Sequence, residues 1–291
     1  MSRRGKNCLQ SALEGPGTCP TAICPAFIIV LGVMAAERYG VYDHFAWFYS
    51  RGWGTDYHQQ LRPVLQDHVF PRLAEGARVL DVCCGSGDLS RVLVERGYKV
   101  TGIDGSAEML LYARSNVPGA VFRLEDARDF HLRSQFGAAL STFDSLNHLL
   151  TLDELESVFT NVYRALLPGG LLMFDLNMEE AFTTMWRGSF SSVEETAVGI
   201  TNGSYDPVEK VGRAQVTLFR AEAGELWRRS DVTVLEKCYT VEEVTAALER
   251  AGFAGIETRE AWELGMRGDI ALGRTFFFAQ RPNSDDCGKL A

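Results

Sequence analysis

Short apolar runs alternate with amphipathic stretches through the first 177 residues of the chain. The apolar run 79–82 leads into a glycine turn, after which Leu89, Val92 and Leu93 recur at the spacing of a helix. Further apolar runs follow at 98–104, 121–124, 136–141 and 171–177, and helices are predicted over 57–73, 106–115 and 152–166, the last ended by Pro168, Gly169 and Gly170. Strands that alternate with helices in this way predict an α/β fold with a doubly wound parallel sheet.

The alternation stops after Asn177. The segments 188–200, 212–221 and 226–240 are predicted strands, and 201–207 and 221–225 have the composition of turns. An antiparallel insertion of three or more strands is therefore expected after the fifth strand. Thr240 and Glu243 then have the spacing of a capping box at the start of a further helix. The last two strands, 255–262 and 274–282, are expected to be antiparallel to each other at the edge of the sheet.

Composition narrows the class of protein. The 291 residues are 46% hydrophobic, which is enough for a sizeable core, and a net charge of −9 argues against a nucleic-acid-binding surface. The apolar run 26–33 is too short to span a membrane. The seven cysteines form neither a disulfide framework nor a metal-binding pattern. We therefore expect a cytoplasmic protein that acts on a small molecule, binds no metal, and contacts neither nucleic acid nor a membrane; a homodimer is compatible with this expectation.

The surroundings of the glycine turn at Gly85 and Gly87 predict the class of ligand. The dinucleotide fingerprint G-x-G-x-x-G/A has Gly or Ala at the position of Ser90, so the match is imperfect. The sequence also has no phosphate-binding G-x-x-x-x-G-K-[ST] loop. Asp81 at the end of the strand and Asp88 at the start of the helix would repel a pyrophosphate. The predicted ligand therefore carries positive charge. S-adenosylmethionine (SAM), which has an ammonium and a sulfonium but no phosphate, fits this requirement.

Two more acids stand at or just beyond the next two apolar runs. The separation in sequence between Asp81 and Asp104 is close to the roughly 20 residues at which a carboxylate accepts from both ribose hydroxyls. Asp126 can accept from an adenine amino group, and the Ala127 N–H can donate to the ring. Together with the motif LDVCCGSG at 80–87, these acids resemble the pattern of class I SAM-dependent methyltransferases over most of the chain.

This resemblance implies a Rossmann-like sheet of seven strands and a set of cofactor contacts. The residues expected to contact SAM are Tyr42, Asp81, Cys83, Gly85, Ser86, Gly87, Asp104, Gly105, Met109, Asp126, Ala127 and Phe143. Among them, Met109 would lie under the adenine and Phe143 would approach the sulfonium. Cys83 would line the site as a small apolar residue.

The stretch YDHFAWFY at 42–49 carries a second resemblance. It is similar to the YDxFAxxY opening of small-molecule N-methyltransferases, including the glycine and amino-sugar enzymes, in which an N-terminal helix closes over SAM. That resemblance implies that Tyr42, and with it Tyr49, faces the methyl donor, and it makes Tyr42 a candidate catalytic residue. For the other aromatic residues of this stretch, packing against the core is the expected role.

His148 is the candidate base. A protonated amine acceptor must lose a proton, and an imidazole with an ordinary pKa of about 6.5 suits that task. Amino-sugar N-methyltransferases have FSSxGH at this point, so His148 matches whereas Asp144 and Asn147 depart from the pattern. A loop histidine bonded to the backbone is the structural alternative. Methylation of oxygen or carbon, a SAM-binding module without activity, and a nicotinamide-dependent oxidoreductase stay open as other functions.

These inferences divide the chain into five expected regions. Residues 1–33 would be a leader that is disordered or absent from a native chain starting at Met34. The SAM-binding core with its aromatic helix would cover 34–177, the antiparallel insertion 178–238 would form a lid over the substrate, the last helix and strands of the core would cover 239–282, and 283–291 would be a tail.

Overall fold

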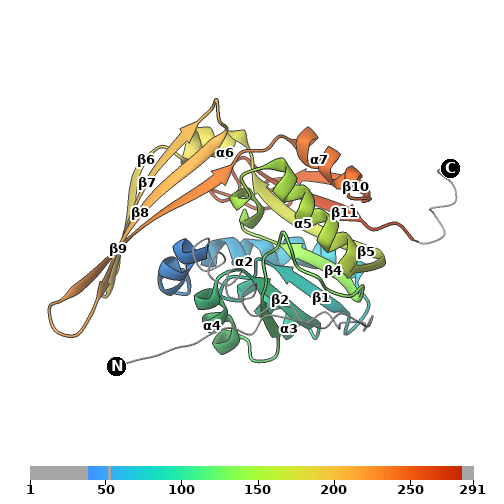
Figure 1. Ribbon diagram of the computed structural model, residues 1–291, viewed down its shortest axis with the longest axis horizontal. Helices are drawn as coiled ribbons and strands as arrows, with labels where there is room; N and C mark the ends of the chain where they lie inside the picture. The colour runs from blue at the N-terminus through green and yellow to red at the C-terminus, as the bar shows by residue number, and fades with distance from the viewer. Residues whose placement is uncertain (1–38, 52–53, 284–291) are drawn as a thin grey trace, which may run out of the picture.

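The computed structural model describes residues 39–51 and 54–283, so the predicted leader 1–33 and Met34 lie outside the described residues, as do 284–291 of the predicted tail. Residues 39–49 form the first described helix. The elements that follow are α2 (Thr55–Val64), η1 (Leu65–Val69), η2 (Phe70–Arg72), β1 (Arg78–Val82), α3 (Asp88–Glu95), β2 (Lys99–Asp104), α4 (Ala107–Asn116), β3 (Val121–Leu124), β4 (Phe136–Ser141), η3 (Ser145–His148), α5 (Leu152–Ala165), β5 (Leu166–Asn177), α6 (Glu179–Met185), β6 (Gly188–Val193), β7 (Ala197–Asp206), β8 (Val211–Ala221), β9 (Trp227–Lys237), α7 (Val241–Arg250), β10 (Ala254–Glu260) and β11 (Arg274–Gln280). Figure 1 shows a main body of sheet and helices, with β6 to β9 set to one side of it.

Seven strands form the main sheet in the order β10-β11-β5-β4-β1-β2-β3. Strands β1 to β5 are parallel, whereas β11 is antiparallel to both β5 and β10. The predicted doubly wound, seven-stranded α/β sheet and the antiparallel pair at its edge are thereby confirmed. Because β2 and β4 lie on opposite sides of β1, the strand order reverses between β1 and β4. Folds of this type bind their ligands at the carboxyl ends of the strands at such a reversal.

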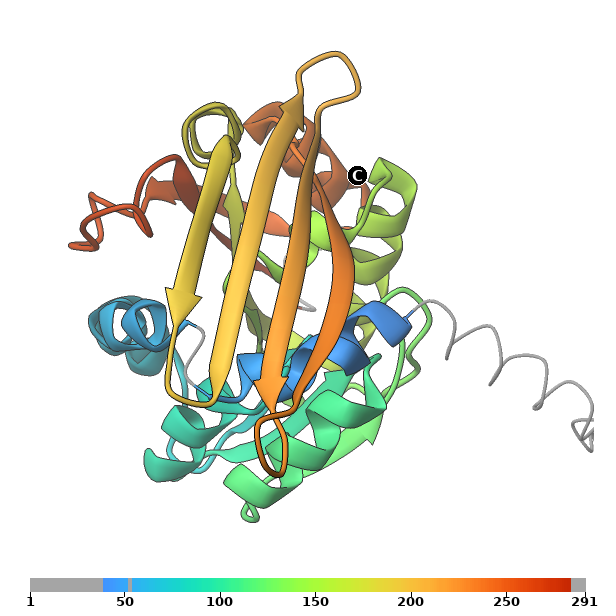
Figure 2. The ribbon, with the colours of Figure 1, turned by 90° about the vertical axis from the view of Figure 1, so that its left-hand side faces the viewer.

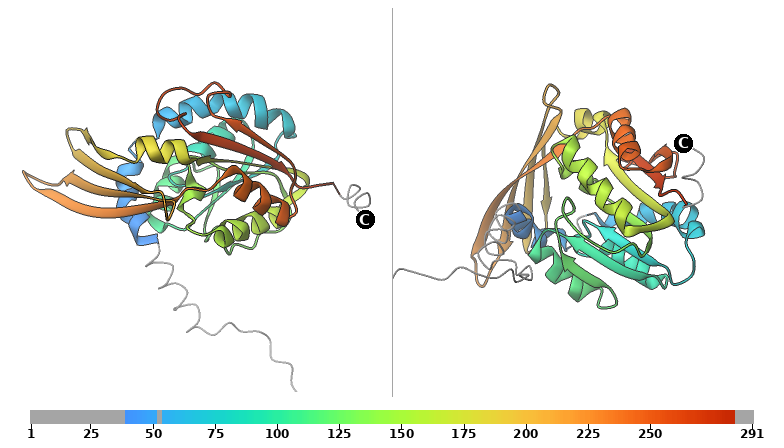
Figure 3. Two further views of the ribbon diagram at one scale, coloured as in Figure 1. Left: turned by 90° about the horizontal axis from the view of Figure 1, so that it is seen from above. Right: turned by 45° about the vertical axis from the view of Figure 1, so that its right-hand side comes forward.

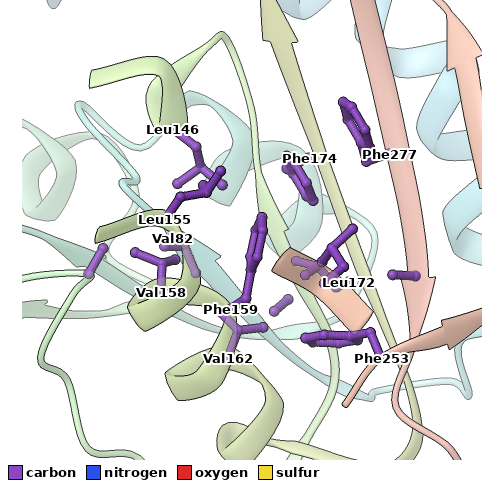
Figure 4. Close-up of a cluster of buried hydrophobic side chains, with 14 of the residues drawn as sticks. Val82, Leu146, Leu155, Val158, Phe159, Val162, Leu172, Phe174, Phe253 and Phe277 are labelled. Atoms are coloured by element: carbon purple, nitrogen blue, oxygen red, sulfur yellow. The ribbon is translucent and has the colours of Figure 1, made fainter. Parts of the chain in front are cut away.

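The strand side chains alternate between two hydrophobic cores, one on each face of the main sheet. Leu80 and Val82 of β1 pack in the core that contains Phe159 of α5, and Figure 4 shows Val82 and Phe159 in this cluster. Val79 belongs to the core on the other face, which contains Leu61 of α2. A strand buried on both faces needs apolar residues at successive positions, which explains the continuous apolar runs in the sequence.

The insertion after β5 begins with the short helix α6 and forms a separate antiparallel sheet of four strands, in the order β6-β7-β8-β9. The insertion is confirmed, but two details of the prediction are wrong. The segment 188–200 contains two strands, β6 and the first part of β7, and the supposed turn at 201–207 contains the rest of β7, which ends at Asp206. The turn to β8 comes at 207–210.

The reason for the second difference lies at Asn202 and Gly203, a pair that favours turns. Both residues are paired with β6 on one side and with β8 on the other, so ladder hydrogen bonds override the turn preference. A Cβ on Gly203 would lie 3.1 Å from the Cα of Trp186. Glycine is therefore required here by the close approach of two backbones rather than by a turn.

The helix predicted over 57–73 is also interrupted. It is α-helical to Val64 and continues as the wider turn η1 and the tighter turn η2. Helix α5 ends at Ala165, before the Pro-Gly-Gly sequence, because Leu166 already pairs with Phe136 of β4.

Among the described residues, no helix has the length and apolar character needed to cross a lipid bilayer.

Two predicted helix starts are confirmed. The Ser106 hydroxyl accepts a hydrogen bond from the Met109 N–H at the start of α4. Thr240 and Glu243 form the reciprocal capping box at the start of α7. In both places a side-chain oxygen satisfies a backbone donor that the first helical turn leaves without a partner.

The helical segment 39–49 lies between the four-stranded sheet and the main body, as Figures 2 and 3 show from different sides. Phe48 of this segment is buried in a cluster with Val216 and Leu218 of β8. A Cβ on Gly199 of β7 would come within 2.7 Å of the Phe48 ring. Sheet and helix thus meet in close contact, and the insertion helps to hold the aromatic segment over the ends of the parallel strands.

Candidate active site

A cavity of about 780 Å³ lies at the carboxyl ends of the parallel strands, between the main sheet and the four-stranded sheet. This volume is in the usual range for small-molecule sites. The predicted site residues that line the cavity are Tyr42, Cys83, Gly85, Asp104, Gly105, Met109, Asp126, Ala127, Phe143 and His148. Asp81, Ser86 and Gly87 are buried behind this lining and do not reach it. The structure therefore brings most of the predicted residues together around one space.

The turn after β1 has the left-handed backbone conformation that glycine residues favour. Gly85 and Gly87 have φ angles of 51° and 88°, and Cys83 adopts a φ of 59°, which is uncommon for a residue with a side chain. Behind the turn, the Asp81 carboxylate accepts from the Ser90 hydroxyl at 2.6 Å. Burial raises the pKa of Asp81 to about 7, because the charged form is desolvated.

Asp104 braces the glycine turn from the end of β2. One carboxylate oxygen accepts from the Gly85 N–H at 2.8 Å and the other from the Ser106 N–H at 2.9 Å. Burial raises the pKa of Asp104, although these backbone donors oppose the rise. A carboxylate has about four lone-pair positions, so acceptor capacity remains for a ligand in the cavity.

Asp126 is part of an ion-pair cluster that the sequence analysis missed. The Arg128 guanidinium donates to the two Asp126 oxygens at 2.8 and 2.6 Å, to Glu154 at 2.6 Å and to the Tyr39 hydroxyl at 3.2 Å. Hydrogen bonds from Arg128 hold the pKa of Asp126 below its usual value despite partial burial. The predicted contact of Asp126 with adenine stays a prediction, and Arg128 is a second polar group at that end of the cavity.

Phe143 and Asp144 form a strained turn after β4, with φ angles of 63° and 52°. Asp175 of β5 holds this turn, because its carboxylate accepts from both of their N–H groups and from the Tyr57 hydroxyl at 2.6 Å. The Tyr57 ring stacks on Phe143 at a centroid distance of 4.6 Å. The signal for Asp175 in the sequence was a single acid inside the apolar strand LLMFDLN, where an isolated charge is costly.

Tyr42 and Tyr49 come from the helical segment 39–49 and line the same cavity. The Tyr49 ring lies 6.4 Å from the Phe143 ring, and the Tyr42 ring meets the His148 ring edge-on at 5.4 Å. Burial raises the pKa of both tyrosines, so that both phenols are neutral near pH 7. The aromatic segment thus covers the strand ends with uncharged rings.

His148, at the end of η3, faces strand β9. Its Nδ1 lies 3.3 Å from the Leu235 carbonyl oxygen, and its Nε2 lies 3.8 Å from a carboxylate oxygen of Glu236. Burial lowers the pKa of His148, so the ring is neutral over a wider pH range. A carbonyl oxygen only accepts, so Nδ1 carries the proton in the neutral ring and Nε2 is the basic nitrogen. Sequence analysis missed Glu236 because strand β9 joins the site only through the fold.

Asn147 has a structural role. Its side-chain amide donates to the carbonyls of Asn177 and Lys237, at 3.0 and 2.8 Å, and its side-chain oxygen accepts from the Asn177 N–H at 2.9 Å. These bonds tie η3 to β5 and β9. The departure of Asn147 from the amino-sugar pattern therefore concerns the scaffold under His148 and does not bear on the choice of acceptor.

Comparison with known proteins agrees with this fold. Residues 79–170 match the family model described as a methyltransferase domain. The putative methyltransferase YqeM of Bacillus subtilis is 31% identical over 185 residues, which cover 62% of this chain and 75% of that protein. A dTDP-3-amino-3,4,6-trideoxy-α-D-glucopyranose N,N-dimethyltransferase of Streptomyces venezuelae is 33% identical over 135 residues, which cover 46% of this chain and 55% of that protein.

Among solved structures, a SAM-bound amino pentose methyltransferase from Micromonospora echinaspora superposes with a TM-score of 0.61 at 26% identity, over 82% of this chain and 96% of that one. The chain belongs to the class I SAM-dependent methyltransferases. It is an enzyme of this class and its cofactor is SAM. These similarities do not favour the nicotinamide-dependent and non-catalytic alternatives.

The residues present fit this cofactor. A Cβ on Gly85 would already contact the Tyr49 ring at 3.4 Å, so a larger side chain would occupy the space between the turn and this ring. Asp104 keeps free acceptor positions, as two ribose hydroxyls require. The cavity lining holds acids and neutral aromatic rings next to the glycine turn, an environment suited to a sulfonium and unsuited to a pyrophosphate.

Proposed function

We propose that this methyltransferase places a methyl group on the amino nitrogen of a small molecule, and that amino sugars are the first acceptors to test. The observation that carries the proposal is His148, a partly buried imidazole that lines the cavity and whose basic Nε2 makes no hydrogen bond with the described residues. An amine acceptor has a proton to lose and needs such a group. The sugar N,N-dimethyltransferase and the amino pentose methyltransferase named above support the choice of nitrogen.

We assign the cofactor contacts to the loops after β1 to β4. Asp104 would accept from the ribose hydroxyls, Asp126 and the Ala127 N–H would bind the adenine, and Met109 would lie under the ring. Phe143 would lie beside the sulfonium. When bound, SAM supplies a methyl carbon on a positively charged sulfur, and a nucleophile attacks this carbon in line while the C–S electron pair stays on sulfur.

The chain's own residues then align the acceptor and remove its proton. Tyr42, Tyr49 and Phe143 surround the reacting end with neutral rings, which excludes water and leaves the acceptor nitrogen as the nucleophile. His148 Nε2 takes the proton that the ammonium form must release before its lone pair can attack. Nδ1 keeps its proton because it donates to the Leu235 carbonyl.

The test is methyl transfer with a matched pair of acceptors. The purified enzyme is incubated with SAM and dTDP-3-amino-3,4,6-trideoxy-α-D-glucopyranose, or with the sugar that carries a hydroxyl in place of the amine. Mass spectrometry should detect methylation of the amino sugar, and fragmentation should place the methyl group on nitrogen. Methylation of the hydroxy sugar with none of the amino sugar would contradict the proposal and favour an O-methyltransferase.

A further inference from the structure

Glu236 of β9 is a buried carboxylate without a full set of partners. The residue is 4% exposed, it lines the cavity, and its Oε2 makes no hydrogen bond with the described residues. Leaving a buried acceptor unsatisfied is costly, and the cost is larger for an ionised group. A residue held in this way at a ligand cavity points to a bound group that donates to it.

The neighbours of Glu236 define what kind of group fits. One oxygen each of Asp144 and Glu236 and one ring nitrogen of His148 all lie within 4.8 Å of one another. Arg274 donates to Asp144 at 2.8 Å and also pairs with Asp175, so one guanidinium already serves two carboxylates. Arg274 makes no hydrogen bond with Glu236, although its charge and the Asn177 side chain oppose the rise in the pKa of Glu236. The cluster is short of positive charge, and a cationic ligand would supply it.

We propose that Glu236 anchors the ammonium group of the acceptor, and that His148 takes a proton from the same nitrogen. This inference rests on the proposed function, because it requires an amine acceptor. An ammonium has three N–H donors, so it can donate to Glu236 Oε2 and to His148 Nε2 at once. The two atoms come from β9 and η3, which fixes the acceptor nitrogen between the insertion and the main sheet.

The proton step balances with these groups alone. One N–H bond of the ammonium breaks, its electron pair stays on nitrogen as the attacking lone pair, and the proton forms a bond with His148 Nε2. The imidazolium later releases the proton to water. Burial raises the pKa of Glu236 and lowers that of His148, so neither side chain favours its charged form before the cation arrives.

An organic ammonium fits this cluster better than a divalent metal ion. A metal would need oxygens of both carboxylates, yet Asp144 is already bonded to Arg274. At the same distance from the guanidinium, a divalent ion would be repelled about twice as strongly as an ammonium. The ammonium needs only Glu236 and His148, with Asp144 left in place as a more distant negative charge.

Binding measurements test the anchor without relying on turnover. Calorimetry on enzyme saturated with S-adenosylhomocysteine would compare the binding of dTDP-3-amino-3,4,6-trideoxy-α-D-glucopyranose with that of its hydroxy counterpart. The wild-type enzyme should bind the amine roughly 10-fold or more tightly, as expected for a charge-assisted hydrogen bond in a buried site. Glu236→Gln should reduce this ratio to near one while its affinity for SAM stays that of the wild type, which also shows that the variant is folded.

Glu225→Gln, an exposed change at the β8–β9 turn, is the matched control and should keep the amine preference. The inference is overturned if Glu236→Gln retains that preference. It is also overturned if the variant loses SAM affinity instead, which would assign Glu236 to the sulfonium, or if the enzyme holds one Mn²⁺ or Zn²⁺ per chain that Glu236→Gln abolishes. If the wild-type enzyme methylates the amino sugar and any of these results appears, the anchor alone is wrong. If the enzyme methylates the hydroxy sugar and not the amino sugar, both the proposed function and the anchor are wrong.

Discussion

At the scale of single residues, three acids in or behind the cavity lining are buried in a way that disfavours their charged form. Asp81, Asp104 and Glu236 all have a raised pKa with desolvation as the largest cause, although each also has donors or cations nearby. Such groups gain most when a ligand brings positive charge, because the ligand replaces the hydration that folding removed. The ammonium and sulfonium of SAM and the ammonium of the proposed acceptor are cations of this kind.

The pKa of Asp81 predicts an unusual dependence of stability on pH. The unfolded chain releases this proton near its ordinary pKa of 3.8, whereas the folded protein keeps it until about pH 7. Between these values the folded state binds more protons, so the contribution of Asp81 to the free energy of unfolding falls as pH rises. Asp81→Asn should therefore match the wild type near pH 4 and exceed its stability at pH 8 by up to about 4 kcal/mol.

Denaturant unfolding at several pH values, without SAM, measures this difference. SAM affinity gives a second readout, because wild-type binding should strengthen as pH rises through about 7 and binding to Asp81→Asn should not. A constant stability difference between the two proteins from pH 4 to 8 would show that Asp81 does not hold its proton in the folded state.

His148→Ala should lower the rate of amine methylation by roughly 10²-fold or more, as expected for the loss of a positioned base. In the wild type, the rate should rise with pH through a limb below 6.5, because burial lowers the pKa of His148 and only the neutral ring accepts a proton. The variant should lose this limb and keep its SAM affinity. His131→Ala, at an exposed histidine, is the control and should leave the rate and the limb unchanged. If His148→Ala keeps the wild-type rate and the wild-type pH limb, the base assignment and the preference for nitrogen are wrong.

At the scale of elements, the placement of η3 decides where His148 points. The element is only four residues long and has no side-chain cap, so its position depends on what it is tied to. Asn147 makes that connection with three hydrogen bonds to β5 and β9. A histidine in a short turn therefore faces the insertion strand with a fixed ring.

Asn147→Ala should reduce the free energy of unfolding by roughly 2–4 kcal/mol, because it removes a buried side chain that bonds the partly buried Asn177 N–H and two carbonyls. It should also reduce turnover, since η3 is no longer tied to β9, while SAM binding changes less. Chemical denaturation and calorimetry measure these effects. Asn202→Ala, an exposed position in β7, is the control. A fully stable Asn147→Ala protein would show that the turn is held by other contacts.

The elements show what the sequence can and cannot predict. Local patterns were sufficient for the strand–helix alternation and for the caps at Ser106 and Thr240, because those signals lie within one turn or one strand. The end of β7 was missed because Asn202 and Gly203 take their conformation from neighbours on both sides. The same limit applies to the site. Asp104 could be found from its place after a strand, whereas Glu236 reaches the cavity only through the docking of the insertion.

At the scale of the whole molecule, one buried network joins the end of the chain to the site. Arg274 at the start of β11 pairs with Asp175 of β5 and with Asp144 of the loop after β4, and its guanidinium lies 5.0 Å from the centre of the Tyr57 ring. Since Asp175 also holds the turn at Phe143, the antiparallel strand β11 supports a turn that the parallel strands present to the ligand. Four segments far apart in the sequence meet at this point.

Arg274→Met should therefore lower the free energy of unfolding by about 3–5 kcal/mol, because it leaves the buried Asp175 and the partly buried Asp144 without their cation. It should also weaken SAM binding, since Asp175 would lose the cation that holds its carboxylate beneath the N–H groups of Phe143 and Asp144. Arg259→Met on the exposed β10 is the control and should be nearly neutral. Denaturant titration and calorimetry supply the two measurements.

The double variant Arg274→Met, Asp175→Asn separates charge from packing. If the loss in Arg274→Met comes from an uncompensated charge, the second substitution should recover part of the stability, because the new amide carries no charge and can still accept from the Tyr57 hydroxyl. Recovery of SAM affinity should be smaller, since an amide has one accepting oxygen where the carboxylate had two for the turn. Equal stability of the single and double variants would mean that Arg274 acts by filling space against Tyr57 and Phe143 rather than by its charge.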